Sequence, residues 1–211
     1  MKKSKQVIVR NIEEILDIGI ALTAEKSYDR ILEMILEQAR IITNADAGTL
    51  YLCEGNNLIF KVLQNDSMEI GSLSLRTDSK LPVLPINKKS AAGFAALTGD
   101  IVNISDVYQN TEFDFAGPKL YDKLTGYKTI SILVVPLKNT EDKVLGVLQL
   151  INAKDEVGNI ISFTKDYNKV VFSLASQAAM TLTNIWHVEQ IKDLMNSFVE
   201  SMATAIDART P

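Results

Sequence analysis

The chain has 211 residues, of which 46% are hydrophobic and 23% charged, a composition typical of a folded domain with a sizeable core. Its 22 basic and 26 acidic residues give a net charge of −4 without a basic stripe, which argues against direct binding of nucleic acid. The single cysteine excludes an internal disulfide, and no apolar run approaches the roughly 20 residues that spanning a bilayer requires. The acidic residues Glu13, Glu14 and Asp17 leave the start of the chain without the apolar region of a signal peptide. We therefore expect a cytoplasmic protein that does not enter a membrane.

Two helices are expected at the start of the chain. Residues 5–24 space their apolar side chains at helical intervals. Ser27 is suited to cap a second helix over 28–45, in which Asp29 lies in the first turn. The apolar face of this second helix comprises Ile31, Leu32, Ile35, Ala39 and Ile42.

The hydrophobic period changes after residue 45. Residues 46–66 alternate apolar with other side chains on either side of turn residues at 54–57, which predicts a β-hairpin. Residues 69–75 predict a third, weaker strand. Pro82 and Pro85 indicate a loop over 81–89.

The middle of the chain combines a short helix, a long loop and two strong strands. Ser90 is suited to cap an Ala-rich helix that ends at Gly99, before a brief strand over 101–104. Residues 108–128 predict a polar loop with one helical turn, and loops of that length inside a compact domain are often functional. The strands over 128–137 and 143–152 should pair antiparallel at the centre of the sheet. With the long helix that follows, this order predicts an α+β fold around one antiparallel sheet.

The long helix carries a heptad pattern from residue 171 onward. Nine of eleven a and d positions are apolar, and β-branched residues at a positions favour parallel two-stranded coiled coils. Over 165–185 two interpretations stay open, packing on the helix's own domain or packing on a partner. Beyond His187 we expect a coiled-coil or bundle homodimer that also uses the N-terminal helix. The a positions are Val171, Ala178, Ile185, Lys192, Val199 and Ile206, and the d positions are Leu174, Thr181, Val188, Met195 and Met202.

The sequence lacks a constellation for catalysis or metal binding. His187 is the only histidine and lies far along the chain from Cys53, so converging ligands or a Cys-His pair are missing. Cys53 lies on a predicted strand and is better interpreted as a small buried hydrophobe. We expect no metal site, no certain cofactor and no catalytic residue in this chain.

Five segments follow one another along the chain: ADAGTLYL, SAAGFAALTGDIVNISDVY, LTGYKTISILVVPLKN, VLGVLQLIN and SLASQAAMTLTN. Together they resemble a GAF domain, the small-molecule sensing module of cyclic-nucleotide phosphodiesterases and bacterial signalling proteins. The resemblance covers roughly residues 10–190 and implies a sheet of about six antiparallel strands. It places the N- and C-terminal helices on one face and a pocket, covered by short helices and loops, on the other. We accordingly divide the chain into a helix (1–26), a GAF domain (27–186) and a signalling helix (187–211).

The stretch INAKDEVGNIISFTKDY partly matches the motif of the cyclic-nucleotide-binding subclass, which has Asn-Lys, then Phe, then three residues and Asp-Glu. The matching residues are Asn152, Lys154, Phe163 and Asp166, but the Lys is displaced by one position and Tyr167 replaces the Glu. The resemblance implies that these residues brace the fold through a Lys154–Asp166 ion pair. Absence of that pair would count against cyclic-nucleotide binding.

A purine-like ligand needs an apolar wall and a few polar partners. Aromatic and polar residues of the segment over the sheet supply both, and the helix start at Ser90 to Gly93 offers N–H groups to a phosphate. Gln149 lies among apolar neighbours on one face of its strand, where a ligand edge could satisfy its amide. Each residue could equally be core or a turn cap, so we consider them as a set. The ligand-binding candidates are Ser90, Gly93, Phe94, Asp106, Asp114, Phe115, Tyr121, Tyr127, Thr129, Ser131 and Gln149.

The stretch SFVESMATAIDARTP (197–211) resembles the opening helix of HD-GYP domains, bacterial phosphodiesterases of cyclic di-GMP. The resemblance implies that such a metal-dependent phosphohydrolase domain follows in the full-length protein. One functional hypothesis is a sensor that binds a small ligand, such as cAMP or cGMP, orders residues 108–128 and signals through a dimeric helix. The other is a dimerisation scaffold whose pocket is closed by its own side chains.

Overall fold

The computed structural model describes residues 20–21, 24–25, 27–74 and 83–207. The helix expected over 5–24 lies almost wholly outside them. In the described part of the chain, no helix combines the length and apolarity that crossing a bilayer requires.

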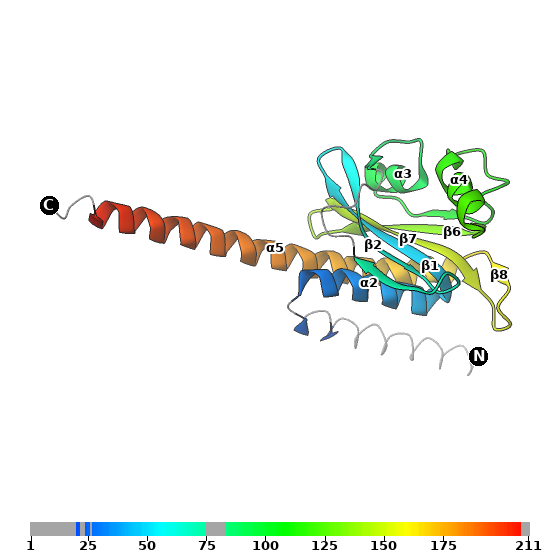
Figure 1. Ribbon diagram of the computed structural model, residues 1–211, viewed down its shortest axis with the longest axis horizontal. Helices are drawn as coiled ribbons and strands as arrows, with labels where there is room; N and C mark the ends of the chain where they lie inside the picture. The colour runs from blue at the N-terminus through cyan, green and yellow to red at the C-terminus, as the bar shows by residue number, and fades with distance from the viewer. Residues whose placement is uncertain (1–19, 22–23, 26, 75–82, 208–211) are drawn as a thin grey trace.

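One curved antiparallel sheet organises the fold, in the strand order β3-β2-β1-β7-β6-β5, so that β1 and β7 lie at its centre (Figure 1). This confirms the predicted α+β class, the hairpin and the pairing of the two strong strands. Two short strands pair outside this order: β4 with β2, and β8 with β7. The strands are β1 (Ala45–Glu54), β2 (Asn57–Asn65), β3 (Ile70–Ser74), β4 (Leu84–Pro85), β5 (Val102–Ile104), β6 (Ile132–Lys138), β7 (Val144–Lys154) and β8 (Ile160–Ile161).

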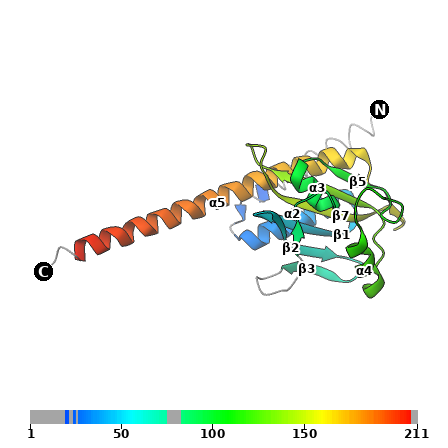
Figure 2. The same ribbon diagram turned by 90° about the horizontal axis from the view of Figure 1, so that it is seen from above.

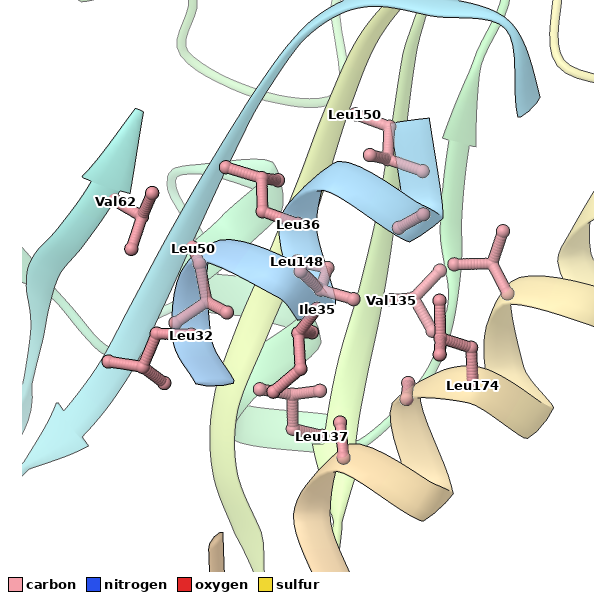
Figure 3. Packing of buried hydrophobic residues seen from close by; sticks show 14 of the residues in the cluster. Leu32, Ile35, Leu36, Leu50, Val62, Val135, Leu137, Leu148, Leu150 and Leu174 are labelled. Carbon is pink, nitrogen blue, oxygen red and sulfur yellow. The ribbon is translucent and has the colours of Figure 1, made fainter. Parts of the chain in front are cut away.

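Helices α2 (Tyr28–Thr43) and α5 (Lys165–Asp207) cover one face of the sheet (Figures 1 and 2). Ser27 caps α2 as predicted, its hydroxyl accepting a hydrogen bond from the Arg30 N–H at 3.4 Å. Figure 3 shows the leucine and isoleucine side chains of α2 directed at leucines of β1 and β7, with Leu174 of α5 beside Val135. This helix-side core is the main apolar layer of the domain.

Helices α3 (Ala91–Thr98) and α4 (Ala116–Thr125) lie over the other face. The hydroxyl of Ser90 caps α3 and Gly99 ends it in the left-handed conformation, both as predicted. A second apolar cluster lies between α3, the following loops and the sheet. The two faces of the sheet therefore have different neighbours: α2 and α5 on one face, α3 and α4 on the other.

The predicted loops contain more regular structure than expected. Residues 108–128 hold the ten-residue helix α4 rather than a single turn, and the loop over 81–89 contributes the short strand β4. Gly117 and Pro118 lie in the first turn of α4, where a proline removes only an N–H that lacks a helical partner in any case. The pair is therefore compatible with a helix start.

The long helix α5 changes environment along its length. Its a and d residues Val171, Leu174 and Ala178 are fully buried against the sheet and α2, which favours packing on its own domain for residues 165–185. Beyond this part, α5 extends away from the domain (Figures 1 and 2) and exposes large apolar side chains. These are Trp186, Val188, Ile191, Leu194, Met195, Phe198, Val199 and Met202.

Ile35→Ala should destabilise the domain, because Ile35 is 0% exposed between α2 and the sheet. The cavity and lost burial should lower the free energy of unfolding by about 2–5 kcal/mol. Ile41→Ala on the same helix is the matched control, since Ile41 is 64% exposed and should change stability by no more than about 0.5 kcal/mol. Urea unfolding followed by circular dichroism measures both, and equal effects would contradict this placement of α2.

Candidate ligand-binding site

The sheet face below α3 and α4 is mainly apolar. Alternation along β7 puts Val147 and Ile151 in the cluster on this face, and Leu148 and Leu150 in the helix-side core. Gln149 therefore lies on the face predicted from the sequence. Such a surface suits the ring of a flat ligand.

Three phenylalanines pack over this face. The rings of Phe94 and Phe113 have centroids 5.5 Å apart, those of Phe113 and Phe115 6.4 Å apart, and both pairs meet edge to face. Phe94 and Phe115, predicted as apolar wall, belong to this hydrophobic cluster, and their contact with a ligand stays a prediction. Phe113 was missed, although it belongs to the same aromatic stretch of the sequence.

Gln149 is a polar side chain on this mainly apolar face, and its amide atoms are accessible to solvent. It is half-buried, and among the residues that the structure describes none is hydrogen-bonded to its amide. Thr49, which is buried, lies directly opposite it on β1. Thr49 was not among the predicted site residues, although the alternation of 49, 51 and 53 is visible in the sequence. A ligand edge placed here would meet an amide and a hydroxyl.

The first turn of α3 is hydrogen-bonded to its N-cap residue. The Ser90 hydroxyl accepts a hydrogen bond from the Gly93 N–H at 3.0 Å, so this donor is already used. A Cβ on Gly93 would lie 2.7 Å from the carbonyl oxygens of both Pro85 and Asn87. Both residues therefore hold the helix against the preceding loop, and their phosphate-binding role stays a prediction.

A buried carboxylate of α4 anchors residues 108–128, the segment that lies over this face of the sheet. We call residues 108–128 the covering segment. Asp122 accepts hydrogen bonds from the Tyr108 hydroxyl and from the N–H and hydroxyl of Thr129, each at 2.8 Å. The Thr129 hydroxyl has thus donated its hydrogen, and only its lone pairs remain for a ligand. Asp122 was missed, because nothing in its sequence neighbourhood distinguishes it from an exposed helical aspartate.

A second buried carboxylate, Asp46, lies at the start of β1 and is 3% exposed. It accepts hydrogen bonds from the hydroxyls of Tyr127 at 2.8 Å and Ser67 at 2.7 Å, and it forms an ion pair with Lys154. The Tyr127 hydroxyl in turn accepts a bond from the Asn152 amide at 3.0 Å. We call these five residues the Asp46 cluster.

Asn152 connects the Asp46 cluster to the end of the covering segment. It adopts the left-handed conformation, and its amide oxygen accepts hydrogen bonds from the N–H groups of Ile130 and Ser131 at 2.7 and 3.2 Å. The Ser131 hydroxyl donates to the Ile161 carbonyl at 2.7 Å. Asn152 and Ser131 thus act as braces, as the motif resemblance implied for Asn152. Phe163 is buried in the helix-side core.

Lys154 pairs with Asp46 and not with Asp166, which corrects the ion pair expected from the motif. Asp166 is exposed in the first turn of α5, where it complements the helix dipole. Because side chains alternate along a strand, the one-residue displacement moves the lysine to the opposite face. Ala153 occupies the face toward α5 instead. By the criterion set out above, this counts against a cyclic-nucleotide ligand.

The Asp46 cluster holds its members in defined protonation states. Burial by itself would raise the pKa of Asp46, but hydrogen bonds from Lys154, Ser67 and Tyr127 bring that pKa below its ordinary value. Burial and the hydrogen bond to Asp46 raise the pKa of Tyr127 far above its usual range. At neutral pH Asp46 is therefore a charged acceptor and Tyr127 a neutral donor.

The remaining predicted residues support the covering segment from outside the apolar cluster. Asp106 accepts a hydrogen bond from the Tyr108 N–H, and Asp114 accepts one from the Ala116 N–H, both at 2.8 Å. Tyr121 is 41% exposed, with its hydroxyl 3.4 Å from the Met68 sulfur. Asp106 and Asp114 thus stabilise turns, and Tyr121 lies on the outer surface.

The described residues contain no group of three or more His, Cys, Asp or Glu side chains that could hold a metal ion. Cys53 is half-buried at the end of β1, and burial raises the pKa of its thiol, which disfavours the reactive thiolate. His187 is exposed on α5. The raised pKa therefore does not favour Cys53 as a nucleophile.

Comparison with known proteins agrees with this architecture. A family model for the GAF domain matches residues 27–182. The dual 3′,5′-cyclic-AMP and -GMP phosphodiesterase 11A of Takifugu rubripes is 36% identical over 132 residues, and the cGMP-specific 3′,5′-cyclic phosphodiesterase of Drosophila virilis is 31% identical over 135 residues. These alignments include 62% and 61% of this chain but only 14% of each relative.

Among solved structures, the GAF domain from an Acinetobacter phosphoenolpyruvate-protein phosphotransferase superimposes with a TM-score of 0.62 at 16% sequence identity. The superposition covers 87% of this chain and 98% of that domain. At this level of identity the likeness concerns the fold alone.

Asp46→Asn should destabilise the protein at neutral pH by about 1–3 kcal/mol, because an amide N–H would replace an acceptor that faces buried donors. The folded-state pKa of Asp46 lies below its ordinary value, so its stabilisation is present above about pH 4 and is lost as the pH falls through the folded pKa. The stability difference between wild type and variant should therefore narrow below about pH 4.

Chemical unfolding at several pH values measures this difference. Asp193→Asn, at an exposed position of α5, is the control and should change stability by no more than about 0.5 kcal/mol. A difference between wild type and Asp46→Asn that stays constant down to pH 2 would contradict the role assigned to the carboxylate.

Proposed function

The chain belongs to the GAF domain family, and on that basis we propose that it is a regulatory module that senses a small ligand. Its relatives include proteins named as cyclic-nucleotide phosphodiesterases, of which this chain matches a small part. An enzymatic role for the chain itself has no support in the chemistry of its described residues. The activity that it regulates belongs to another domain.

The observation that carries the proposal is Gln149, a half-buried residue on a mainly apolar face whose amide has no hydrogen-bond partner in the described structure. Its amide atoms remain accessible to solvent, so a ligand can bond to them in place of water. A flat ligand between the sheet and the phenylalanines would bury its ring on the apolar side chains and present its polar edge to Gln149 and Thr49. The relatives make cAMP and cGMP the first probes, although the position of Lys154 counts against them.

The Asp46 cluster provides a route from the covering segment to the helices. Tyr127, at the end of that segment, is hydrogen-bonded to the Asp46 carboxylate. The buried Arg40 in the last turn of α2 donates to the backbone carbonyls of Ala45 and Asp46 at 3.3 and 3.0 Å. Movement of Tyr127 therefore acts on the junction of α2 and β1, and α2 packs against α5.

The signalling helix is the proposed output. A ligand shifts its arrangement only if it binds one arrangement more tightly, and about 1.4 kcal/mol of preference gives a tenfold shift. We propose that exposed apolar residues of α5 pair with a second copy in a homodimer that also uses the N-terminal helix. The resemblance of residues 197–211 supports a downstream HD-type phosphohydrolase domain as the regulated enzyme.

The alternative function is a dimerisation scaffold with a closed pocket. Phe113, Phe115 and Val107 are buried in the cluster above the sheet, so they already occupy part of the space that a ligand would need. Mass spectrometry of the purified protein and calorimetry with cyclic nucleotides distinguish the two functions. If no ligand co-purifies and none binds, the scaffold function is favoured.

Gln149→Leu should weaken binding of cAMP or cGMP, whichever binds the wild type, by about 10- to 100-fold, because it removes the amide from the ligand edge. The fold should tolerate leucine among apolar neighbours. Gln109→Leu is the control at an exposed position and should keep wild-type affinity. Calorimetry gives both affinities, and an unchanged affinity of Gln149→Leu would remove this residue from the site.

Tyr127→Phe should disconnect the covering segment from α2 without abolishing ligand binding. In wild type, the nucleotide should alter hydrogen exchange of the amides at 39–43; in the variant this change should be reduced at least by half. Tyr121→Phe, which alters an exposed hydroxyl, is the control. An undiminished response in Tyr127→Phe would show that the signal bypasses the Asp46 cluster.

Val199→Glu should weaken self-association at least tenfold, because it puts a charge at an a position of the proposed seam. Ser201→Glu adds the same residue at an exposed position off the a/d seam and should leave the dimer intact. Analytical ultracentrifugation should give twice the chain mass of 23.3 kDa for wild type. A wild-type protein that remains monomeric at high concentration would refute the dimer.

A further inference from the structure

A pocket of about 580 Å³ lies at the end of the sheet opposite the Asp46 cluster. Pairing of Leu52 with Gly146 brings the β1–β2 and β6–β7 turns to this end, where the last turn of α3 joins them. Cys53 is seven residues from Asp46 along β1, roughly 23 Å at the rise of a strand. The pocket is lined by Cys53, Gly55, Ile86, Ala96, Leu97, Thr98, Gly99, Lys138, Asp142, Lys143 and Val144.

This pocket is separate from the candidate site described above, because none of that site's residues lines it. Its volume falls within the roughly 300–1,000 Å³ that small-molecule sites usually have. Ile86, Leu97 and Val144 provide apolar wall, and the charged side chains come from the β6–β7 hairpin. The pocket thus combines apolar surface with charge at one edge.

The charge of Lys138 is already compensated. Its side chain crosses Gly99, where an added Cβ would lie 2.4 Å from its Cε and 2.7 Å from its Nζ. The ammonium is therefore held near the C-terminal end of α3, which carries partial negative charge. It also lies 3.5 Å from the Asp142 carboxylate.

Lys143 differs from Lys138, because it forms no ion pair with any residue that the structure describes. It lines the same pocket and is exposed. Its charge lowers the pKa of the Cys53 thiol against the opposing effect of burial, as expected of an ammonium group close to this part of the pocket. An uncompensated cation beside apolar surface is suited to an anionic group on an apolar body.

We propose that this pocket is a second ligand site that takes a small organic anion. Lys143 binds the carboxylate or phosphate of the ligand, and Ile86, Leu97 and Val144 contact its apolar body. The proposal does not depend on the sensory function, because the two sites share no residue. It gives the chain a binding surface at the turns of the sheet as well as below α3 and α4.

The single cysteine provides a direct readout, since alkylation by iodoacetamide reports only on Cys53. Naphthalene-2-carboxylate at millimolar concentration should slow this alkylation. The neutral naphthalene-2-carboxamide has the same ring system without the charge, and should bind about tenfold more weakly. Equal protection by the two compounds, or protection by neither, would overturn the proposal.

Lys143→Gln should weaken binding of the carboxylate about tenfold, and Lys123→Gln, at an exposed position of α4, should not. Affinity is taken from the concentration dependence within each variant, because loss of Lys143 also alters the reactivity of the thiol. An unchanged affinity in Lys143→Gln would refute the assigned contact. Saturating cGMP should leave the titration unchanged, so failure of nucleotide binding and failure of this site are separate results.

Discussion

The buried carboxylate of Asp46 is the constraint on which much of this structure depends. A charged group at 3% exposure is tolerated only where donors surround it, and here an ammonium and two hydroxyls do so. These donors come from β7, from the turn after β2 and from the end of the covering segment. Satisfying one side chain therefore fixes three parts of the chain against the start of β1.

The sheet separates two kinds of interior. Toward α2 and α5 the contacts are aliphatic and closely packed, and they hold the helices in place. Toward α3 and α4 the cluster is richer in aromatic side chains, and a polar pair from the central strands, Gln149 and Thr49, lies on the same face of the sheet. Successive residues of β1 and β7 contribute alternately to the two faces. A displacement of either strand caused by one layer therefore also moves side chains of the other layer.

Local sequence signals predicted the elements that depend on local chemistry. Ser27, Ser90 and Gly99 marked helix ends correctly, and the period-2 pattern of β7 put Gln149 on the proper face. The length of helix α4 was underestimated, because a Gly-Pro pair occurs both in turns and at helix starts. The sequence thus sufficed for the fold class and most of the sheet.

The polar partners could not be predicted, because they depend on contacts between distant segments. Asp122 and Asp46 look like ordinary aspartates in the sequence, and their donors lie up to 108 positions away. The motif resemblance gave Lys154 the wrong partner, since a one-residue displacement on a strand reverses the face. Register, rather than residue type, decided this contact.

The exposed part of α5 has a mechanical consequence. About 20 residues extend past the domain, which at the rise of an α-helix is about 30 Å. As a rigid lever of this length, the helix would turn a tilt of about 5° at its base into a displacement of about 3 Å at its far end. Changes at the base too small to disturb the core would thus become large enough at the tip to alter the contacts of the proposed dimer.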